Sequence, residues 1–220
     1  YEYFTRHYMK ILFTGGGSGG HFYPIIAVAE SLNKITKNEH LLDAKLYYMA
    51  PVPYNSRALL ENSITFVQNP AGKIRRYFSL LNIIDAFKTG WGIIIAIIKV
   101  FSIFPDVIFS KGGYASFPAL VAGKLFRIPI VIHESDSAPG RVNLWAGTFA
   151  TRIAISYSEA SSFFSSDKIA YTGNPIRKEI MTPTTEGSKK FLNLEEGIPT
   201  IVILGGSQGA ETINEIVIQS

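Results

Sequence analysis

The stretch FTGGGSGGHFYP, residues 13–24, follows a short apolar run and leads into an amphipathic pattern. Six consecutive small residues at 15–20 leave the backbone almost bare, and His21 follows them directly. A strand, a glycine turn and a helix in this order are typical of parallel α/β sheets, where bare N–H groups at the helix start bind phosphate or other anionic oxygen. The stretch therefore predicts an anion-binding turn at the carboxyl end of a strand.

The same alternation of strand and helix continues along the chain. A helix is predicted from residue 24 to 35 and a longer one over about 79–103, because their apolar residues recur at helical spacing. Apolar runs that are nearly continuous predict strands at 10–14, 44–50, 64–68, 106–110, 128–133, 152–156 and 168–173. Such strands, separated by helices, indicate a parallel sheet covered by helices on both faces.

The domain organisation follows from a polar stretch near the end of the chain. We expect a Rossmann-like N-terminal domain over 9–175, a linker over 176–198, and the first strand and helix of a second domain over 199–220. One strand and one helix leave their hydrophobic faces uncovered. The second domain is therefore expected to be truncated.

Composition excludes several classes of protein. The chain has 220 residues, of which 47% are hydrophobic and 17% charged, so it is not a disordered chain. It has no cysteine, which excludes disulfide scaffolds and thiolate metal sites. The sequence shows no cluster of metal ligands and no signal-peptide pattern, so we expect no metal, no other cofactor and a cytoplasmic location.

The net charge of +4 is concentrated in residues 73–104, which hold five basic residues and one acidic residue. A transmembrane span needs about 20 apolar residues, and Lys99 interrupts the apolar run too early. Either this segment is a buried helix with a basic outer face, or it docks on anionic lipid. Nucleic acid is not an expected partner, because no recognised binding motif accompanies the charge. The residues predicted to face a membrane are Lys73, Arg75, Arg76, Phe78, Leu81 and Trp91.

The glycine loops match two further motifs less well. Residues 15–20 fit the dinucleotide-binding pattern, but the second predicted strand, 44–50, is not followed by the acidic residue that would bind ribose. Residues 16–20 and 205–209 also fit the nucleophile elbow of α/β-hydrolases. No histidine follows Ser207, so a hydrolase triad has little support.

Four stretches make a family resemblance specific: GGGSGGHFYPIIAVAESL, PDVIFSKGGYASFPALVAGKLFRIPIVIHESDSAPGRVNLWAGTFATRIAISY, TGNPIRKEI and ILGGSQGAETINE. In order and spacing, residues 9–220 resemble the MurG family of bacterial peptidoglycan glycosyltransferases. The resemblance implies a GT-B fold, in which two Rossmann-like domains face a cleft. It implies inverting transfer of N-acetylglucosamine from UDP-GlcNAc to the muramic acid 4-hydroxyl of lipid I, which gives lipid II. It also implies a peripheral position on the cytoplasmic face of the inner membrane.

The resemblance implies roles for single residues as well. His21 matches the histidine proposed as the catalytic base, and a histidine pKa near neutrality suits that role; the structural alternative is a histidine that only caps the turn. The matched donor contacts are Ser18, Gly19, Gly20, Asp136, Arg177 and Ser207. The matched contacts to the acceptor and its diphosphate are Gly17, Gly112, Gly113 and Tyr114.

The chain also departs from the family pattern. It reads HESD where the family usually reads HEQN, so Asp136 replaces an asparagine that contacts the sugar. An ionised aspartate accepts hydrogen bonds but cannot donate one, which puts donor specificity in question. Two alternatives remain: a non-catalytic, membrane-docking acceptor half of a split GT-B transferase, or a GT-B enzyme for another lipid acceptor. We expect the 220-residue chain alone to be inactive.

Overall fold

The computed structural model describes residues 8–38, 44–73, 79, 81–182, 187–195, 197–205 and 210–219. The chain divides into two compact units, Tyr1–Arg177 and Lys178–Ser220. The first unit holds the sheet and the pocket discussed below, and the second is described separately.

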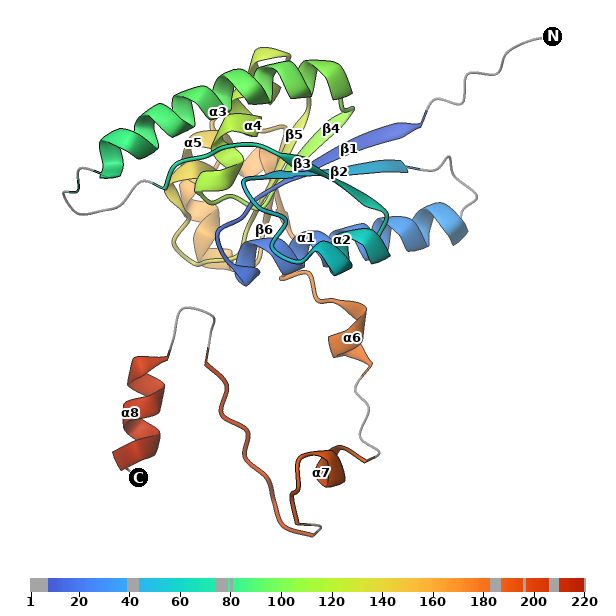
Figure 1. Cartoon of the computed structure of the whole chain (residues 1–220), viewed down its shortest axis with the longest axis vertical. Helices are drawn as coiled ribbons and strands as arrows, with labels where there is room; N and C mark the ends of the chain where they lie inside the picture. The colour runs from blue at the N-terminus through green and yellow to red at the C-terminus, as the bar shows by residue number, and fades with distance from the viewer. Residues whose placement is uncertain are drawn as a thin grey trace. The chain divides into compact units, whose positions relative to one another are not determined.

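The first unit is built on a parallel sheet of seven strands in the order β3-β2-β1-β4-β5-β6-β7 (Figure 1). The order reverses between β1 and β4, and open α/β sheets bind ligands at the carboxyl ends of the strands beside such a reversal. The sheet confirms the predicted fold class. The strands are β1 (Met9–Thr14), β2 (Ala44–Ala50), β3 (Ile64–Gln68), β4 (Val107–Ser110), β5 (Ile130–Glu134), β6 (Arg152–Ile155) and β7 (Ile169–Tyr171).

Helices cover both faces of this sheet. Figure 1 shows α1 (Gly19–Asn38) and α2 (Ser56–Glu61) on one face and α3 (Leu81–Ile103) and α4 (Phe117–Leu125) on the other. The remaining helix of the unit is α5 (Arg141–Gly147), and its 3-10 turns are η1 (Tyr114–Ser116), η2 (Ser158–Phe163) and η3 (Ser166–Lys168).

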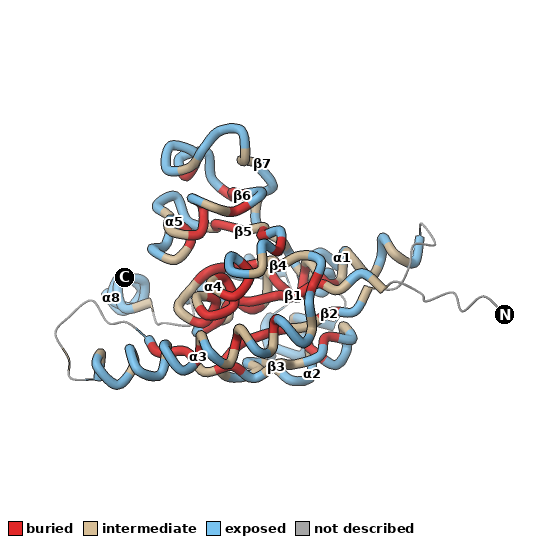
Figure 2. The backbone as a smooth tube through the Cα atoms, turned by 90° about the horizontal axis from the view of Figure 1, so that it is seen from above, coloured by how far each residue is buried: buried red, intermediate tan, exposed pale blue. Residues whose placement is uncertain are grey.

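The alternation of side chains along β1 explains why there are two cores. Ile11 and Phe13 belong to the cluster beneath α1, whereas Leu12 belongs to the cluster beneath α4. Successive residues of a strand point to opposite faces, so an uninterrupted apolar strand fills both layers. Figure 2 shows the buried residues concentrated in β1, β4 and α4, with exposed residues along the outer side of α3.

Helix α3 lies on the sheet through a few small side chains. Its buried residues are Gly92, Ala96 and Val100, and the Asn69 amide donates a 3.1 Å hydrogen bond to the Gly92 carbonyl. By length and composition alone this helix of 23 residues could cross a membrane, although Lys99 argued against a span. Only 17% of the apolar stretch of this helix is buried. The interpretation of the segment as an ordinary buried helix is therefore wrong for most of the surface of α3.

The second unit contains α6 (Lys178–Met181), α7 (Ser188–Phe191) and α8 (Glu211–Gln219). Helix α8 corresponds to the helix that was predicted after residue 199. The strand predicted before it is not formed, and Ile201 and Leu204 are exposed. A strand needs a neighbour to pair its backbone N–H and C=O groups, and the described residues of this unit offer no second strand.

Candidate functional site

The carboxyl ends of β1, β4 and β5 meet where the strand order reverses, and the loops that follow them enclose a pocket of about 240 Å³. Its lining includes His21 from the start of α1, Lys111 after β4, and Glu134 at the end of β5. Three segments that are far apart in sequence thus supply titratable side chains to one cavity.

Glycines let two of these loops approach each other closely. Gly17 has a φ of +99°, and a Cβ there would lie 2.7 Å from the Tyr114 ring. Gly113 has a φ of +79°, and a Cβ there would lie 2.8 Å from the Gly16 carbonyl and 3.3 Å from His21 Nε2. Any other residue at either position would be strained and would separate the loops. The predicted donor and acceptor loops therefore form one wall beside His21.

His21 is held by a hydrogen bond from within its own loop. Ser18 Oγ lies 2.9 Å from His21 Nδ1, so Ser18, which is predicted to contact the donor, also contacts the candidate base. When Nδ1–H donates to this hydroxyl, Nε2 carries the free lone pair and can accept a proton.

The surroundings of His21 favour its neutral form. Burial lowers the pKa of the imidazole below 6.5, the Lys111 ammonium lowers it further, and Asp136 and Glu134 offset part of the change. A neutral imidazole is the form that can act as a general base, so the site keeps His21 ready to accept a proton near pH 7.

Glu134 organises the loop after β5. Its side chain is buried, and Oε1 accepts from the backbone N–H groups of Ser135 and Asp136 at 2.9 and 3.0 Å. Oε2 accepts from the Gly140 N–H at 3.0 Å and from the Asn143 amide at 2.9 Å. Four donors thus hold this carboxylate in place, and through it the loop that carries Asp136.

Lys111 is a buried lysine, only 2% exposed, and Nζ donates a 2.7 Å hydrogen bond to Ser135 Oγ. Burial lowers the pKa of its ammonium, and Glu134 and Asp136 offset part of that effect. Sequence reasoning missed both Lys111 and Glu134. A signal was present, since each is a charged residue at the end of an apolar strand-like run.

The other predicted site residues are placed as follows. Asp136 is exposed at the pocket. The Arg177 guanidinium lies 4.0 Å from the centre of the Tyr23 ring, two residues after His21 in α1. Gly112 follows Lys111 and Gly19 begins α1, whereas Ser207 lies outside the described residues. Among the residues that the structure describes, no three His, Asp or Glu side chains gather as metal ligands.

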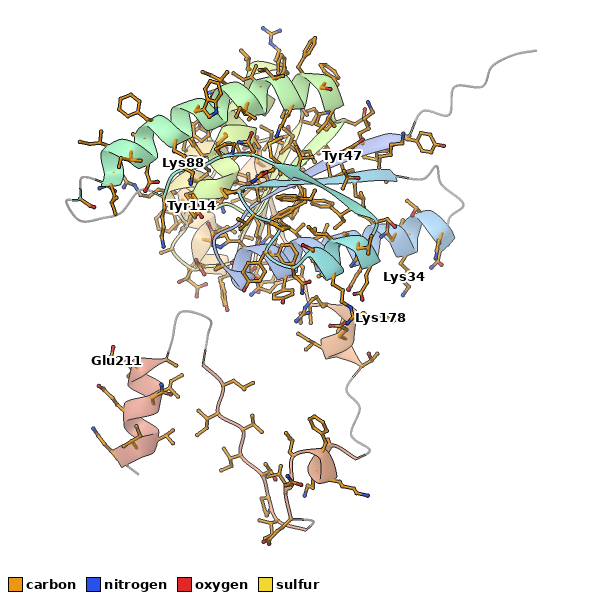
Figure 3. All side chains as sticks on the ribbon, in the orientation of Figure 1. Lys34, Tyr47, Lys88, Tyr114, Lys178 and Glu211 are labelled. Carbon is orange, nitrogen blue, oxygen red and sulfur yellow. The ribbon has the colours of Figure 1, made fainter. Side chains whose placement is uncertain are left out.

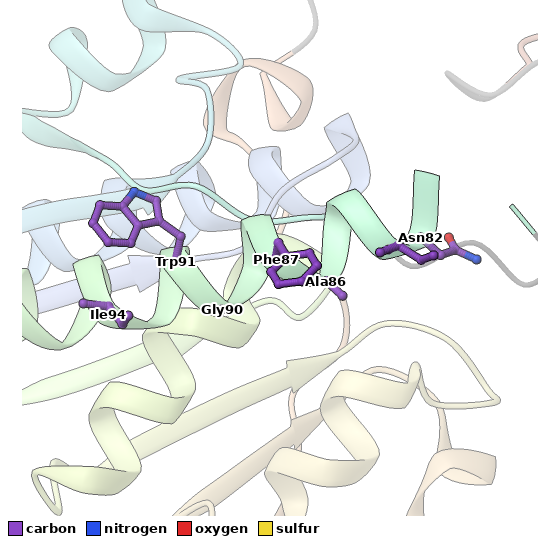
Figure 4. Close-up of a pocket in the computed structure, with 7 residues that line it drawn as sticks. Asn82, Ala86, Phe87, Gly90, Trp91 and Ile94 are labelled. Carbon is purple, nitrogen blue, oxygen red and sulfur yellow. The ribbon is translucent and has the colours of Figure 1, made fainter. Parts of the chain in front are cut away.

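A second surface lies along α3. An open groove of about 760 Å³ is lined there by apolar side chains, among them Phe87, Trp91 and Ile94 (Figure 4). Phe87 is 77% and Trp91 60% exposed. Leu81 and Lys73 are exposed as well, whereas Arg75, Arg76 and Phe78 lie outside the described residues.

Residues 11–155 match the model of the glycosyltransferase family 28 N-terminal domain. Curated relatives named UDP-N-acetylglucosamine–N-acetylmuramyl-(pentapeptide) pyrophosphoryl-undecaprenol N-acetylglucosamine transferase share 35% identity in Treponema denticola and 37% in Legionella pneumophila. These matches cover 96% and 94% of this chain but 55% and 56% of the relatives. The chain therefore spans about half the length of the curated relatives it matches.

Solved structures support the fold. The MurG of Acinetobacter baumannii matches with a TM-score of 0.57 and 21% identity, over 80% of this chain and 48% of that one. Anabaena Alr3699/HepE, solved in complex with UDP and glucose, matches with a TM-score of 0.56 and 16% identity, over 84% of this chain and 50% of that one. The family model and the curated relatives together show that the chain belongs to glycosyltransferase family 28 and, within it, to the MurG family.

Proposed function

We propose that this chain supplies the acceptor-binding part of an inverting transferase that moves N-acetylglucosamine from UDP-GlcNAc to the muramic acid 4-hydroxyl of lipid I, giving lipid II. The relatives' names, which specify an N-acetylglucosamine transferase and a pyrophosphoryl-undecaprenol substrate, support the substrates. The observation that carries the proposal is the Ser18–His21 pair at the mouth of the glycine loop, with an imidazole that burial keeps neutral.

In this mechanism His21 Nε2 accepts the proton of the acceptor hydroxyl while the hydroxyl oxygen attacks C1 of the donor sugar. The bond between C1 and the phosphate oxygen breaks, and its electron pair leaves with UDP. Attack opposite the leaving group inverts C1. Proton removal by a positioned base contributes about 10²–10⁴-fold to such a step.

Arg177 and Ser207 are proposed to steady the leaving diphosphate. The guanidinium can form charge-assisted hydrogen bonds to phosphate oxygens, and its place over the Tyr23 ring keeps it next to the α1 start. We further propose that residues 199–220 belong to the donor-binding part of such a transferase.

Replacing the base tests the chemistry. In a protein that also contains the donor-binding part, we expect His21→Ala to lower kcat by about 10²–10⁴-fold with little change in UDP-GlcNAc affinity. Arg57→Ala, at a well-exposed residue of α2, serves as a surface control and is expected to keep normal turnover. Near-normal turnover of His21→Ala would reduce His21 to a residue that caps the turn.

We also propose that the exposed face of α3 docks on anionic lipid at the cytoplasmic face of the inner membrane. Apolar and aromatic side chains along this face would enter the boundary between the lipid headgroups and the acyl chains. Lys73, Arg75 and Arg76 would contact lipid phosphates. Each basic residue near an anionic surface contributes about 1 kcal/mol, and salt weakens that part.

Vesicle sedimentation tests this docking. Binding to vesicles containing anionic lipid should weaken with salt, and it should fall when Lys73, Arg75 and Arg76 are replaced by Gln. The double change Phe87→Ser and Trp91→Ser should also release the protein, whereas Leu60→Ser, at an exposed leucine of α2, should not. Equal binding to neutral and anionic vesicles at every salt concentration would contradict the proposal.

A further inference from the structure

Within the part of the chain that the structure describes, the Lys111 ammonium makes one hydrogen bond to a side chain. An ammonium group has three N–H donors, and the hydrogen bond to Ser135 Oγ at 2.7 Å uses one of them. The residue is 2% exposed and lines the 240 Å³ pocket, so bulk water is largely excluded from the other two. A buried charge without enough partners destabilises a fold, which raises the question of what balances it.

Glu134 offsets part of the effect of burial on the pKa of Lys111, but it makes no direct hydrogen bond to the ammonium in the described structure. Both carboxylate oxygens already accept two hydrogen bonds each, all from backbone N–H groups or the Asn143 amide. In the described structure Lys111 and Glu134, although both line the pocket, form no ion pair within 4.0 Å. The hydrogen bonds of the buried carboxylate thus all go to its own loop and to Asn143, and Lys111 lines the cavity beside it.

The other groups at the cavity fit a glycosyl phosphate. His21 accepts a proton, and Asn143 Oδ1 is a buried acceptor without a partner in the described structure, which suits a sugar hydroxyl. The start of α1 adds backbone N–H groups, since its first hydrogen bonds begin only at His21 N and Phe22 N. Asp136 is exposed at the same cavity, and its carboxylate opposes the binding of an anion there, so the cation and the N–H groups must outweigh it.

We propose that the Lys111 ammonium binds a phosphate oxygen of the acceptor's diphosphate, next to the sugar whose hydroxyl reaches His21. This inference rests on the proposed function and adds to it the cationic residue of the acceptor site. The phosphate supplies the counter-charge and the two hydrogen-bond acceptors that the ammonium lacks.

Occupation of this site also changes the base. The ammonium lowers the pKa of His21, so an anion paired with Lys111 cancels that effect. Burial has the largest effect on the pKa of His21 and lowers it; of the charged groups that act on the ring, Lys111 also lowers the pKa, whereas Asp136 and Glu134 raise it. The imidazole therefore becomes a stronger base when the acceptor phosphate is in place.

Calorimetric titration of this chain with inorganic diphosphate, farnesyl diphosphate and UDP tests the proposal. Lys111→Met keeps a long side chain and removes both the charge and the cost of keeping an ammonium away from water. Lys34→Met is the matched control, because Lys34 is exposed on α1 and projects away from the sheet (Figure 3). Thermal unfolding followed by tryptophan fluorescence verifies that each variant folds, since both tryptophans, Trp91 and Trp145, lie in the first unit.

Lys111→Met is expected to weaken inorganic and farnesyl diphosphate binding about tenfold or more, as loss of a hydrogen bond to a charged group does. Lys34→Met should change neither, and diphosphate should raise the pKa of His21, read from its ring-proton resonances, in the unsubstituted chain. Unchanged binding in Lys111→Met would overturn the proposal, as would the lack of diphosphate binding by the unsubstituted chain. A Lys111-dependence for UDP but not for farnesyl diphosphate would assign the phosphate to the donor and overturn it too.

These outcomes are separable from the test of the proposed function. If binding does not depend on Lys111 while His21→Ala still abolishes turnover, only the role of Lys111 is wrong. If binding depends on Lys111 while His21→Ala retains normal turnover, the anion site stands and the proposed base does not.

Discussion

Ser18 Oγ lies 2.9 Å from Nδ1 of His21, three residues further along the same glycine loop. This contact occupies Nδ1 of the ring and leaves Nε2 on the side of Gly113. A serine that the family resemblance assigned to the donor thus orients the candidate base.

The first prediction concerns this pair. In a protein that includes the donor-binding part, Ser18→Ala should lower kcat about tenfold with little change in the donor KM, because one orienting hydrogen bond of about 1–1.5 kcal/mol is lost. Ser18→Thr keeps the hydroxyl and should retain most of the activity. A higher donor KM with unchanged kcat would instead assign Ser18 to the donor, as the resemblance implied.

The second prediction concerns the support of the loop. Tyr48 is fully buried, and its hydroxyl donates a 2.5 Å hydrogen bond to the Gly15 carbonyl. Tyr48→Phe leaves that carbonyl without its donor, so the free energy of unfolding should fall by about 1–3 kcal/mol. Tyr47 lies on the opposite face of β2 and is only partly buried, so Tyr47→Phe should lower the free energy of unfolding by less than half as much. Denaturant unfolding measures both, and equal losses would contradict the role given to Tyr48.

The sheet could be predicted from the sequence because it depends on local patterns. Apolar runs such as 106–110 and 128–133 supply interior strands of the sheet, whose side chains are buried or partly buried on both faces, so their apolar composition points to parallel strands. The glycine loop and His21 were found for the same reason, since all their signals lie within residues 13–24.

The rest of the site depends on strand pairing, which no local pattern shows. Lys111 and Glu134 meet at one pocket because β4 and β5 are neighbours in register, with Ser110 opposite Ile132. Lys111 is buried only because the loops after β1, β4 and β5 pack together, and this burial is what lowers the pKa of its ammonium. The strand expected after residue 199 is not formed, although residues 200–204 have the apolar composition of a strand. A strand also needs neighbouring strands, and the described residues of the second unit include none.

The third prediction concerns pH. His133 is buried, its Nε2 lies 3.0 Å from the Gly173 carbonyl, and burial lowers its pKa below 6.5 despite that hydrogen bond. A histidine whose pKa is lowered in the folded state binds its proton more readily when unfolded, so its stabilising contribution is full above pH 6.5 and is lost as pH falls.

We therefore expect the free energy of unfolding to decrease between pH 7 and pH 5, by at most about 1.4 kcal/mol per pH unit for each such histidine. His21 contributes in the same direction because its pKa is lowered too. Unfolding experiments on His133→Gln, which cannot titrate, should give a shallower slope. A slope as steep as that of the unsubstituted chain would rule out His133 as a source of the pH dependence.

The last prediction uses two glycines of α3 that differ only in their surroundings. A Cβ at Gly92 would lie 1.9 Å from the Pro70 carbonyl oxygen, whereas a Cβ at Gly90 would meet nothing within 4 Å. Gly92→Ala must push the helix away from residues 69–73, so we expect a loss of more than about 2 kcal/mol in unfolding free energy. Gly90→Ala should instead stabilise by about 0.5–1 kcal/mol, because alanine favours the helix. Denaturant unfolding decides between the two signs, and a stabilising Gly92→Ala would mean that α3 does not rest on the 69–73 segment as the structure places it.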